Sequence, residues 1–419
     1  MNDLIYWIWL SLRCGVGSEL GSYLLAHFKT PKAVFEADEE TLLSLKGITR
    51  DIADALLDRD LSHSERILTY CERMNVGIMT LDSAVYPKRL RSIHAKPILM
   101  YYRGRIPNMD DHVLLACVGT RNCSKSGAEN AYRLGYDLAE AGAIVVSGMA
   151  KGIDTAAQMG ALEAGGHTIA VLGCGIDRAY PSENKDLMEK IAEKGTVMTE
   201  FAPGTEPNGK NFPIRNRIIS GLCQGTIVVE ADDRSGSLIT ARNAERQGRD
   251  LFAYPGNAGN ALSTGTNELI QNGAKLVTCA MDVLVEYELL YPHRIFTERL
   301  IMVGRRAKVE EKVSAMRDVE SPDRYTRKKA SKPKMTESEI VDSAPKAQKK
   351  TIDTSGLSEM EALVISVTED IMSAEEIAVR VSAKKGSAVS VGELLSVLTM
   401  LEISGYVEAL PGGSFQVAG

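Results

Sequence analysis

The 419-residue sequence has no excess of positive charge and few aromatic residues. Its formal net charge is −6, and Phe, Trp and Tyr together make up 5% of the chain. Any nucleic-acid binding must therefore come from local basic patches, because the chain as a whole does not attract polyanions. The hydrophobic share of 44% is ordinary for globular proteins, and the length predicts two or three domains.

Paired cysteines and long apolar runs are also missing. The seven cysteines are scattered, include no CxxC pair and show no metal-ligand spacing with the six histidines. This pattern is typical of a reducing cytoplasm and predicts no metal site. The apolar N-terminus is broken at Asp3 and ends at Arg13. We therefore expect a cytoplasmic protein with neither a membrane span nor a signal peptide.

The chain lacks the usual motifs of catalysis and nucleotide binding. It contains no GxxxxGK[ST], HExxH or GxSxG, and "GCGIDR" lacks the third glycine of the dinucleotide motif. NAD, FAD and P-loop nucleotides are therefore excluded, and we expect no cofactor. Cys174 is either a nucleophile or a small buried residue, and Asp154 is either a base or a helix cap; the structural alternative is preferred for both. Glu230 and Asp232 are expected to orient neighbours rather than bind a metal.

What is present divides into four segments. Residues 1–80 predict short helices, and "LKGITRDIADALL" indicates either a SAM-like or helix-hairpin-helix unit that meets a DNA phosphate, or a plain bundle whose Gly47 ends a helix. Residues 81–290 follow as the main domain. Residues 291–355 are rich in Lys and Arg and predict a charged linker. Residues 356–419 predict three helices and a glycine-tipped hairpin, the winged-helix plan.

The main domain contains six apolar runs separated by helical patterns: "HVLLACVG", "AIVVSG", "TIAVLG", "TVMTEF", "TIVVEA" and "DLFAYPG". Continuous apolar runs predict strands that are buried on both faces, so we expect a parallel sheet with helices on each side. This is a doubly wound α/β fold of Rossmann type.

Small, hydroxyl and basic residues follow these runs, where a parallel sheet binds its ligands. The segment "NFPIRNRIISG" (211–221) adds two arginines beside the start of a helix, where an anion is favoured. The alternative for Arg215 and Arg217 is a salt bridge to Glu200 or Glu230. Phe212 is either a platform for base stacking or a core aromatic. The predicted phosphate contacts are Gly119, Thr120, Arg121, Ser147, Gly148, Lys151, Gly152, Arg215, Asn216, Arg217, Ser235 and Gly236.

Five ordered stretches resemble the DprA/Smf family of DNA-processing proteins: "GMAKGIDTAAQMGAL", "AVLGCGIDRAYPSENKDL", "NFPIRNRIISGL", "VVEADDRSGSLITARNAERQGRDLFAYPGN" and "GTNELIQNGAKLV". The resemblance implies a cytoplasmic homodimer that binds and protects single-stranded DNA and helps to load RecA during natural transformation, with no established enzymatic activity. A histidine is usual in the family where this chain has Gln158. A dimer contact is expected around Leu269 and Ile270.

A different class of function remains as the alternative. Phosphoribohydrolases that act on nucleoside monophosphates share the general fold and use a PGGxGTxxE loop. The corresponding loop in this chain would be "DDRSGSLITA", which lacks that motif, and the only "PGG" lies at 411–413. The sequence therefore favours a binding protein that holds a DNA phosphate.

Overall fold

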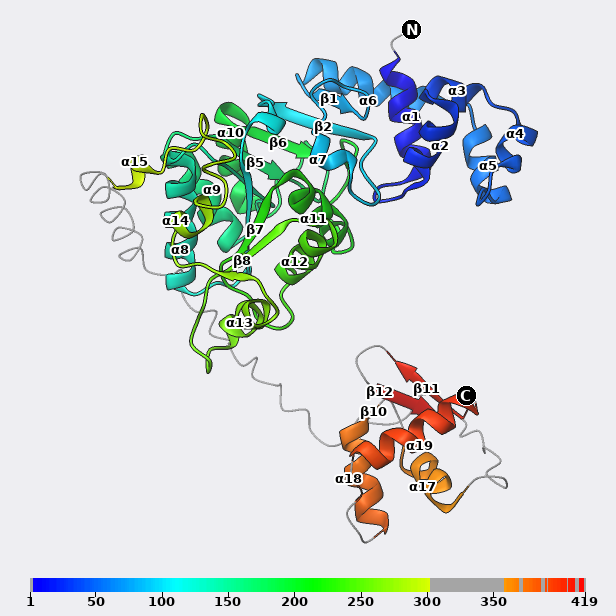
Figure 1. The fold of residues 1–419 in the computed structure, drawn as a ribbon. Helices are drawn as coiled ribbons and strands as arrows, with labels where there is room; N and C mark the ends of the chain where they lie inside the picture. Colours follow the sequence, from blue (N-terminus) through cyan, green and yellow to red (C-terminus); the bar gives the residue numbers. More distant parts are fainter. Residues whose placement is uncertain are drawn as a thin grey trace, which may run out of the picture. The chain divides into compact units, whose positions relative to one another are not determined.

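The computed structural model of the protein describes residues 3–301, 358–368, 372–385, 389, 391–404, 406–410 and 414–417. The chain forms two compact units, Met1–Arg324 and Tyr325–Gly419. The larger unit is a mixed α/β structure built on one sheet, and the smaller unit contains helices and a short sheet (Figure 1).

The sheet of the larger unit has nine strands in the order β1-β2-β6-β5-β4-β3-β7-β8-β9. The six predicted strands are β3 to β8 and pair in parallel, as expected. The expectation of an all-parallel sheet is wrong at one edge, where β2 pairs antiparallel with β1 and β6. The strand bounds are β1 (Gly77–Thr80), β2 (Leu99–Gly104), β3 (Leu114–Val118), β4 (Ile144–Ser147), β5 (Thr168–Val171), β6 (Thr196–Thr199), β7 (Gly225–Val228), β8 (Asp250–Ala253) and β9 (Lys275–Leu276).

Alternate residues of the central strands build two separate cores, because successive side chains of a strand point to opposite faces. Leu115 and Cys117 of β3 belong to the core beneath α8 (Lys125–Glu140), α9 (Ile153–Glu163) and α14 (Ala280–Leu284). Leu114 and Ala116 belong to the core beneath α7 (Lys88–Arg91), α11 (Asn211–Leu222) and α12 (Ser237–Arg246). Helices therefore cover both faces (Figure 1), which is the predicted doubly wound arrangement.

The strand order defines where a ligand site is expected. From β3 the chain steps outward through β4, β5 and β6 on one side, and β7 and β8 continue on the other. The connections after β3 and β7 therefore diverge, and a crevice opens at the carboxyl ends of these two neighbours. The backbone N–H of Thr120 donates to the Glu230 carbonyl at 2.7 Å and holds the two turns together at this point.

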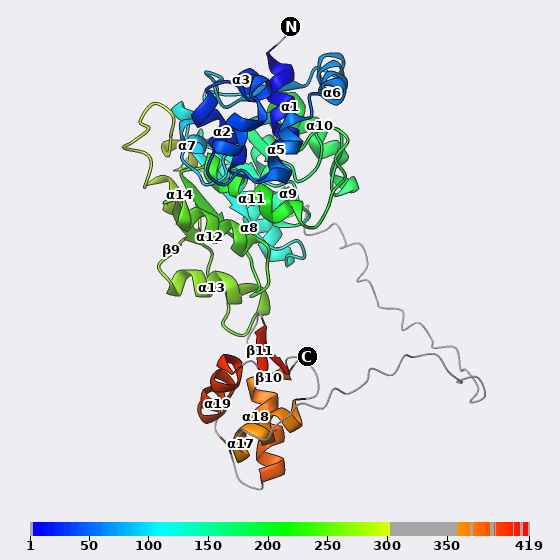
Figure 2. The same ribbon diagram turned by 90° about the vertical axis from the view of Figure 1, so that its right-hand side faces the viewer.

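The N-terminal helices pack against the antiparallel edge of the sheet, where β1 and β2 lie in Figure 1, and Figure 2 shows the same helices from another side. They are α1 (Leu4–Cys14), α2 (Leu20–Phe28), α3 (Pro31–Glu36), α4 (Glu39–Ser44), α5 (Arg50–Leu57) and α6 (Ser62–Arg73). Trp9, Leu24 and Leu56 share one hydrophobic core with Leu99 of β2 and Val197 of β6. β1 precedes the predicted boundary at residue 80 and pairs with β2. The first eighty residues therefore contribute both a strand and a core layer to the larger unit.

The predicted helix, glycine turn and helix are present as α4, Gly47 and α5. Gly47 has φ of +86°. Contact between this turn and DNA stays a prediction.

The start of the predicted linker at residue 291 is too early. Ile295 is 3% exposed and belongs to the core beneath α8, and α15 (Glu298–Ile301) follows it. The N–H of Phe296 donates to the Ala141 carbonyl at 2.9 Å, so this stretch is tied to the end of α8. Because charged residues lie near it in the chain, the sequence pattern did not predict that Ile295 is buried and helps to fix the segment. The rest of the predicted linker, 302–355, lies outside the described residues.

The smaller unit contains three helices, α17 (Glu359–Val367), α18 (Ala374–Lys385) and α19 (Val391–Ile403). They enclose a core that includes Val364, Ile377 and Leu398. A sheet of order β10-β12-β11 accompanies them, with β10 (Met372–Ser373), β11 (Val407–Leu410) and β12 (Ser414–Val417). The element order is the one expected for a winged helix, whose assignment stays a prediction; the glycine tip of the hairpin, 411–413, lies outside the described residues.

No helix in the described part of the chain is long and apolar enough to cross a membrane.

Candidate functional site

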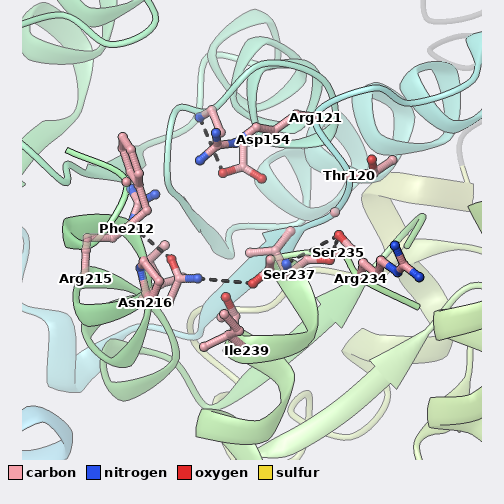
Figure 3. Close-up of a pocket in the computed structure, with 18 of the residues that line it drawn as sticks. Thr120, Arg121, Asp154, Phe212, Arg215, Asn216, Arg234, Ser235, Ser237 and Ile239 are labelled. Atoms are coloured by element: carbon pink, nitrogen blue, oxygen red, sulfur yellow. Dashed lines mark hydrogen bonds between the residues drawn. The ribbon is translucent and has the colours of Figure 1, made fainter. Parts of the chain in front are cut away.

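A cleft of about 480 Å³ lies at the carboxyl ends of β3 and β7 (Figure 3). The turn after β3, the first turns of α11 and the turn before α12 line it. On α11, Phe212, Arg215, Asn216 and Ile219 face the cleft. Their spacing of three and four residues is that of one helix face, so a single stripe of "NFPIRNRIISG" forms this wall.

Phe212 lies between charged and aromatic neighbours rather than in the core. The Arg121 guanidinium lies 4.9 Å from the centre of its ring and that of Arg215 lies 6.0 Å from it. Tyr180 stacks on the same ring with centroids 5.1 Å apart and an interplanar angle of 29°. Two guanidiniums on one ring gain cation–π energy and repel each other. An anion between them would relieve that repulsion.

Arg215 is a buried cation whose nearest charge of opposite sign is the buried carboxylate of Asp154, but no ion pair within 4 Å joins it to any carboxylate among the described residues. It is 4% exposed, and its Nη1 donates to the carbonyl oxygens of Gly148, at 2.8 Å, and Val171. Its Nε donates to Oδ1 of Asn216 at 3.2 Å. Burial lowers the pKa of the Arg215 guanidinium to about 10, and the nearby charge of Arg121 acts in the same direction. Neutral carbonyls thus fix the guanidinium and leave its charge available to the cleft.

Gly148 is required by this arrangement. A Cβ at this position would lie 2.5 Å from Nη2 of Arg215, so any side chain would displace the guanidinium. Asp154 lines the same cleft, and its carboxylate accepts the N–H groups of Gly148, at 3.1 Å, and Ala150, at 3.4 Å. Burial raises the pKa of the Asp154 carboxyl, while the charge of Arg215 opposes the rise. Asp154 therefore orients the loop after β4; it is not the helix cap that the sequence favoured, because the N-cap of α9 is Gly152 and no side chain caps that helix.

The helices that follow β3 and β7, α8 and α12, differ in the groups at their N-termini. At the N-terminus of α8, Ser124 donates its backbone N–H to Glu230 at 2.8 Å, so an internal carboxylate already occupies that position. At the N-terminus of α12, the nearest side-chain partners are hydroxyls: Oγ of Ser235 and Oγ of Ser237 are 2.7 Å apart. The α12 terminus therefore offers N–H dipoles and hydroxyls to an incoming anion. Glu230 has the orienting role that the sequence predicted.

Arg217 requires a correction. It is 9% exposed and does not line the cleft; its Nη2 lies 2.9 and 2.7 Å from the two carboxylate oxygens of Glu200, and its Nε donates to the Ala95 carbonyl at 3.0 Å. Residues two apart on a helix point about 200° apart, so Arg217 cannot face the cleft when Arg215 does. The salt bridge, which was the alternative interpretation, is what the structure contains, and we remove Arg217 from the candidate contacts.

The other predicted contacts fall into two groups. Eight of them line the cleft: Gly119, Thr120, Arg121, Phe212, Arg215, Asn216, Ser235 and Gly236. Ser147, Gly148, Lys151 and Gly152 do not line it. Ser147 is buried and donates to the Cys117 carbonyl at 2.6 Å, and Gly152 approaches the Thr120 carbonyl too closely for a side chain. Lys151 is exposed. These four residues thus support the cleft from behind, although Ala150 and Asp154 of the same segment line it, and the predicted contacts on its surface come from α11 and from the turns after β3 and β7.

Sequence reasoning missed several lining residues, among them Tyr180, Arg234 and Ile239. Arg234 is exposed and has no ion pair in the part of the chain that the structure describes. Its position directly before Ser235 was the available signal. Tyr180 comes from the distant connection after β5, and no local pattern places it on Phe212.

The remaining candidates for chemistry are structural. Burial raises the pKa of the Cys174 thiol to about 11, so it is not a thiolate nucleophile at neutral pH. All seven cysteines are free. Among the described residues, no group of His, Cys, Asp or Glu has the arrangement of a metal site. Gln158 is fully buried, and its Nε2 donates to the Ile169 carbonyl at 3.2 Å, away from the cleft. An imidazole at this position would therefore not reach the ligand directly.

Leu269 and Ile270 lie on α13 (Thr264–Gln271), beside the edge strand β9. Both are half-buried, and Leu269 packs partly against the core beneath α11 and α12. A dimer contact here stays a prediction.

The fold and the cleft define a doubly wound α/β protein with a candidate anion-binding site at its topological switch point. Residues 77–288 match the family model described as DNA recombination-mediator protein A. The DNA processing protein DprA of Streptococcus pneumoniae is 49% identical over 203 residues, which cover 48% of this chain and 71% of that protein. The DprA of Bacillus subtilis is 35% identical over 247 residues, covering 58% of this chain and 83% of the relative.

The solved structure of S. pneumoniae DprA has a TM-score of 0.59 and 38% identity, and it covers 67% of this chain and 97% of its own. The chain therefore belongs to the DprA/Smf family, which confirms the resemblance seen in the five motifs.

Proposed function

We propose that this protein binds single-stranded DNA in the cleft between β3 and β7, protects it and helps to load RecA onto it. One observation carries the proposal: Arg121 and Arg215 share the ring of Phe212, and neither has an ion pair among the described residues. Two adjacent cations are suited to the backbone of a nucleic acid.

The single strand is favoured over the duplex because of the aromatic pair. Tyr180 is 38% exposed and stacks on Phe212, so a base that is free of its partner strand has a platform next to the cations. Phosphate contacts would come from Arg121, Arg215, Arg234 and the α12 terminus at Ser235 and Gly236. These groups read the backbone and not the base edges, so binding should have little sequence preference.

The test is fluorescence anisotropy with labelled single-stranded and duplex oligonucleotides. Arg121→Ala should weaken binding to the single strand, while Arg178→Ala serves as the matched control, because Arg178 is an exposed arginine already paired with Glu206 at 3.0 Å. Both variants should melt at the wild-type temperature. Equal binding of single strand and duplex, or equal losses in both variants, would contradict the proposal.

The enzymatic alternative has a simple assay. A phosphoribohydrolase would release a free base from nucleoside monophosphates, whereas a binding protein leaves them intact. In the cleft, the loop 232–241 supplies Arg234, Ser235 and Ser237, and Asp154 is engaged with backbone N–H groups. We therefore expect no base release when the protein is incubated with each nucleoside monophosphate.

The partners follow from family membership. The family model carries the description recombination mediator, which supports transfer of bound DNA to the RecA recombinase in a cytoplasmic setting. RecA ATPase activity on single-stranded DNA covered with a competing binding protein should rise when this protein is added. A homodimer through Leu269 and Ile270 belongs to the same proposal. Light scattering on the variant with Asp at both positions should report a monomer that still melts cooperatively.

A further inference from the structure

A second cavity of about 500 Å³ lies between the N-terminal helices and the segment that follows β1. Its walls come from α1, α2 and residues 81–96, and it shares no lining residue with the cleft. We call it the N-terminal groove and define it by Trp7, Tyr23, Lys29, Arg91 and Lys96, together with Glu19 and Asp82 on the same lining.

The groove contains a hydrogen-bond donor that the protein does not use. Trp7 is 7% exposed, and its indole N–H finds no acceptor among the described residues, whereas Nε1 of the neighbouring Trp9 donates to the Asp58 carbonyl at 3.0 Å. The Trp7 indole lines the groove and its N–H is not among the buried unpaired donors of the described residues, so it is accessible to a ligand with an acceptor oxygen. Tyr23 is 40% exposed beside it and offers a flat apolar surface.

Three cations line the same groove, and none has an ion pair in the described part of the chain. Lys29 donates only to the Ala26 carbonyl, at 2.6 Å, and the Arg91 guanidinium lies 5.1 Å from the centre of the Tyr86 ring. The two carboxylates are already engaged: Glu19 lies 2.6 Å from Nδ1 of His94, and Asp82 accepts from Oγ1 of Thr80 at 2.5 Å. The groove therefore combines excess positive charge with aromatic surface.

The turn that leads into the groove packs against the helix that forms one wall of the cleft. The turn before α2 approaches the first turns of α11 so closely that a Cβ on Gly17 would lie 2.6 Å from Cγ2 of Ile214. Ile214 lies between Phe212 and Arg215 in the chain, and Glu19 of the groove is two residues from Gly17. The groove and the cleft are therefore linked through the packing of this turn on α11.

We propose that the N-terminal groove is a second contact for the single strand that the cleft binds. Lys29, Arg91 and Lys96 hold phosphates, a base stacks on Tyr23, and the Trp7 indole donates to an oxygen of the nucleic acid. This rests on the proposed function of the cleft. An acidic peptide would use the same cations, but the exposed aromatic surface beside them favours a nucleic acid.

Intrinsic fluorescence tests the groove directly, because Trp7 and Trp9 are the only two tryptophans in the chain. Titration of the full-length protein with an unlabelled oligonucleotide of about thirty nucleotides, longer than the 4–16 nucleotides of a typical site, should quench the emission. An oligonucleotide of about six nucleotides should bind the cleft without quenching. Trp7→Phe should abolish the quenching and keep most of the affinity. Quenching that persists in Trp7→Phe would overturn the assignment.

Charge variants give an independent measurement. Lys96→Glu and Arg91→Glu should weaken binding of the long oligonucleotide and leave binding of the short one unchanged. The slope of log affinity against log salt should fall by roughly 0.7 for each lost phosphate contact. Glu19→Gln should strengthen the long oligonucleotide, a gain that a folding defect cannot produce. Lys32→Glu is the matched control, because Lys32 is exposed on α3 and pairs with Glu36 at 3.7 Å outside the groove.

The outcomes separate the two proposals. If Arg121→Ala weakens both oligonucleotides and the groove variants weaken neither, the cleft stands and the groove is rejected. If Arg121→Ala changes the binding of neither oligonucleotide, the proposed function of the cleft is wrong, whatever the groove variants show. If a polyglutamate peptide quenches Trp7 and the long oligonucleotide does not, the groove binds protein and the inference is wrong.

Discussion

The two arginines on opposite faces of α11 have different kinds of partner. On the cleft face, Arg215 is held by carbonyl oxygens, shares Phe212 with Arg121 and forms no ion pair within 4 Å in the described chain. On the opposite face, Arg217 forms a salt bridge with Glu200, and both side chains are 11% exposed. Arg215 thus lines the cleft, whereas Arg217 attaches α11 to its surroundings through an ion pair.

The attachment extends to the N-terminal helices. Glu200 accepts a backbone hydrogen bond from Gly17, and burial raises the pKa of the Glu200 carboxyl against the opposing charge of Arg217. The contacts run from Gly17 to Glu200 and from Glu200 to Arg217, which lies on the same helix as Arg215. A buried ion pair fixes geometry more than it adds stability. The comparison indicates that the N-terminal region positions the cleft and is more than an added module.

The strongest test of this comparison removes the N-terminal region. A fragment of residues 81–290 lacks β1 and uncovers the core that Leu99 and Val197 share with Trp9. We expect it to lose its cooperative thermal transition, whereas a fragment of residues 1–301, which keeps the larger unit through Ile295, should melt as the full chain does. Circular dichroism melts compare the two. A cooperative transition in 81–290 would make the N-terminal region independent.

The next largest effect is expected at the salt bridge. Arg217→Ala leaves Glu200 buried without its partner and should destabilise the protein by about 3–5 kcal/mol in urea unfolding. The double variant Arg217→Met with Glu200→Leu should recover most of that loss, because apolar replacement of both partners is often neutral. An Arg217→Ala protein with normal stability and impaired DNA binding would instead return Arg217 to the phosphate contacts.

At the cleft, the expected change is in affinity and not in stability. Arg121→Ala and Arg234→Ala should each cost about 1.5–3 kcal/mol of binding free energy, the range for hydrogen bonds to charged groups. The slope of log affinity against log salt should fall by roughly 0.7 per lost contact on a single strand. Melting temperatures should not change, because neither side chain has an ion pair among the described residues. A salt titration of each variant decides the question.

The sequence alone predicted the parallel part of the sheet. Apolar runs located β3 to β8, and the rule that parallel strands bind ligands at their carboxyl ends brought Arg121, Phe212, Arg215 and Ser235 to one cleft. The antiparallel edge was missed because β1 begins only four residues after the end of α6 and because the helical pattern between residues 80 and 99 is a single short turn, α7.

The arginine pair shows where such reasoning stops. Placing 211–222 on a helix already required Arg215 and Arg217 to diverge, so the helical period was an available signal that the reasoning did not apply. Which of the two faces the cleft, and that Glu200 meets the other, depends on how α11 lies on the sheet. The stacking of Tyr180 on Phe212 likewise depends on two connections separated by about thirty residues in the chain.

Removal of the aromatic platform should have a smaller effect with a different signature. Phe212→Ala should cost about 1–3 kcal/mol in binding of a single strand, the range found for base stacking, with little change in salt slope. Phe212→Trp should restore most of the affinity. Tyr180→Ala distinguishes the two surfaces: a loss as large as that of Phe212→Ala means that the base stacks on the pair. Loss of stability without loss of affinity would make Phe212 a packing residue only.

The smallest expected effect tests the coupling between the N-terminal turn and the cleft. Gly15 and Gly17 have φ of +76° and +77°, so alanine is strained to a similar degree at either position. A Cβ at Gly15 meets nothing within 4 Å, whereas one at Gly17 would press on Ile214 of α11. Both variants should lose about 1–2 kcal/mol of stability from the backbone alone.

Only Gly17→Ala should also lose DNA affinity, by about 1 kcal/mol or roughly fivefold, because displacement of Ile214 moves Phe212 and Arg215 with it. Anisotropy with a short oligonucleotide that fills only the cleft isolates this effect from the N-terminal groove. Equal affinities of the two variants would mean that α11 keeps its position when the turn is disturbed, and that the Glu200–Arg217 pair alone holds the helix.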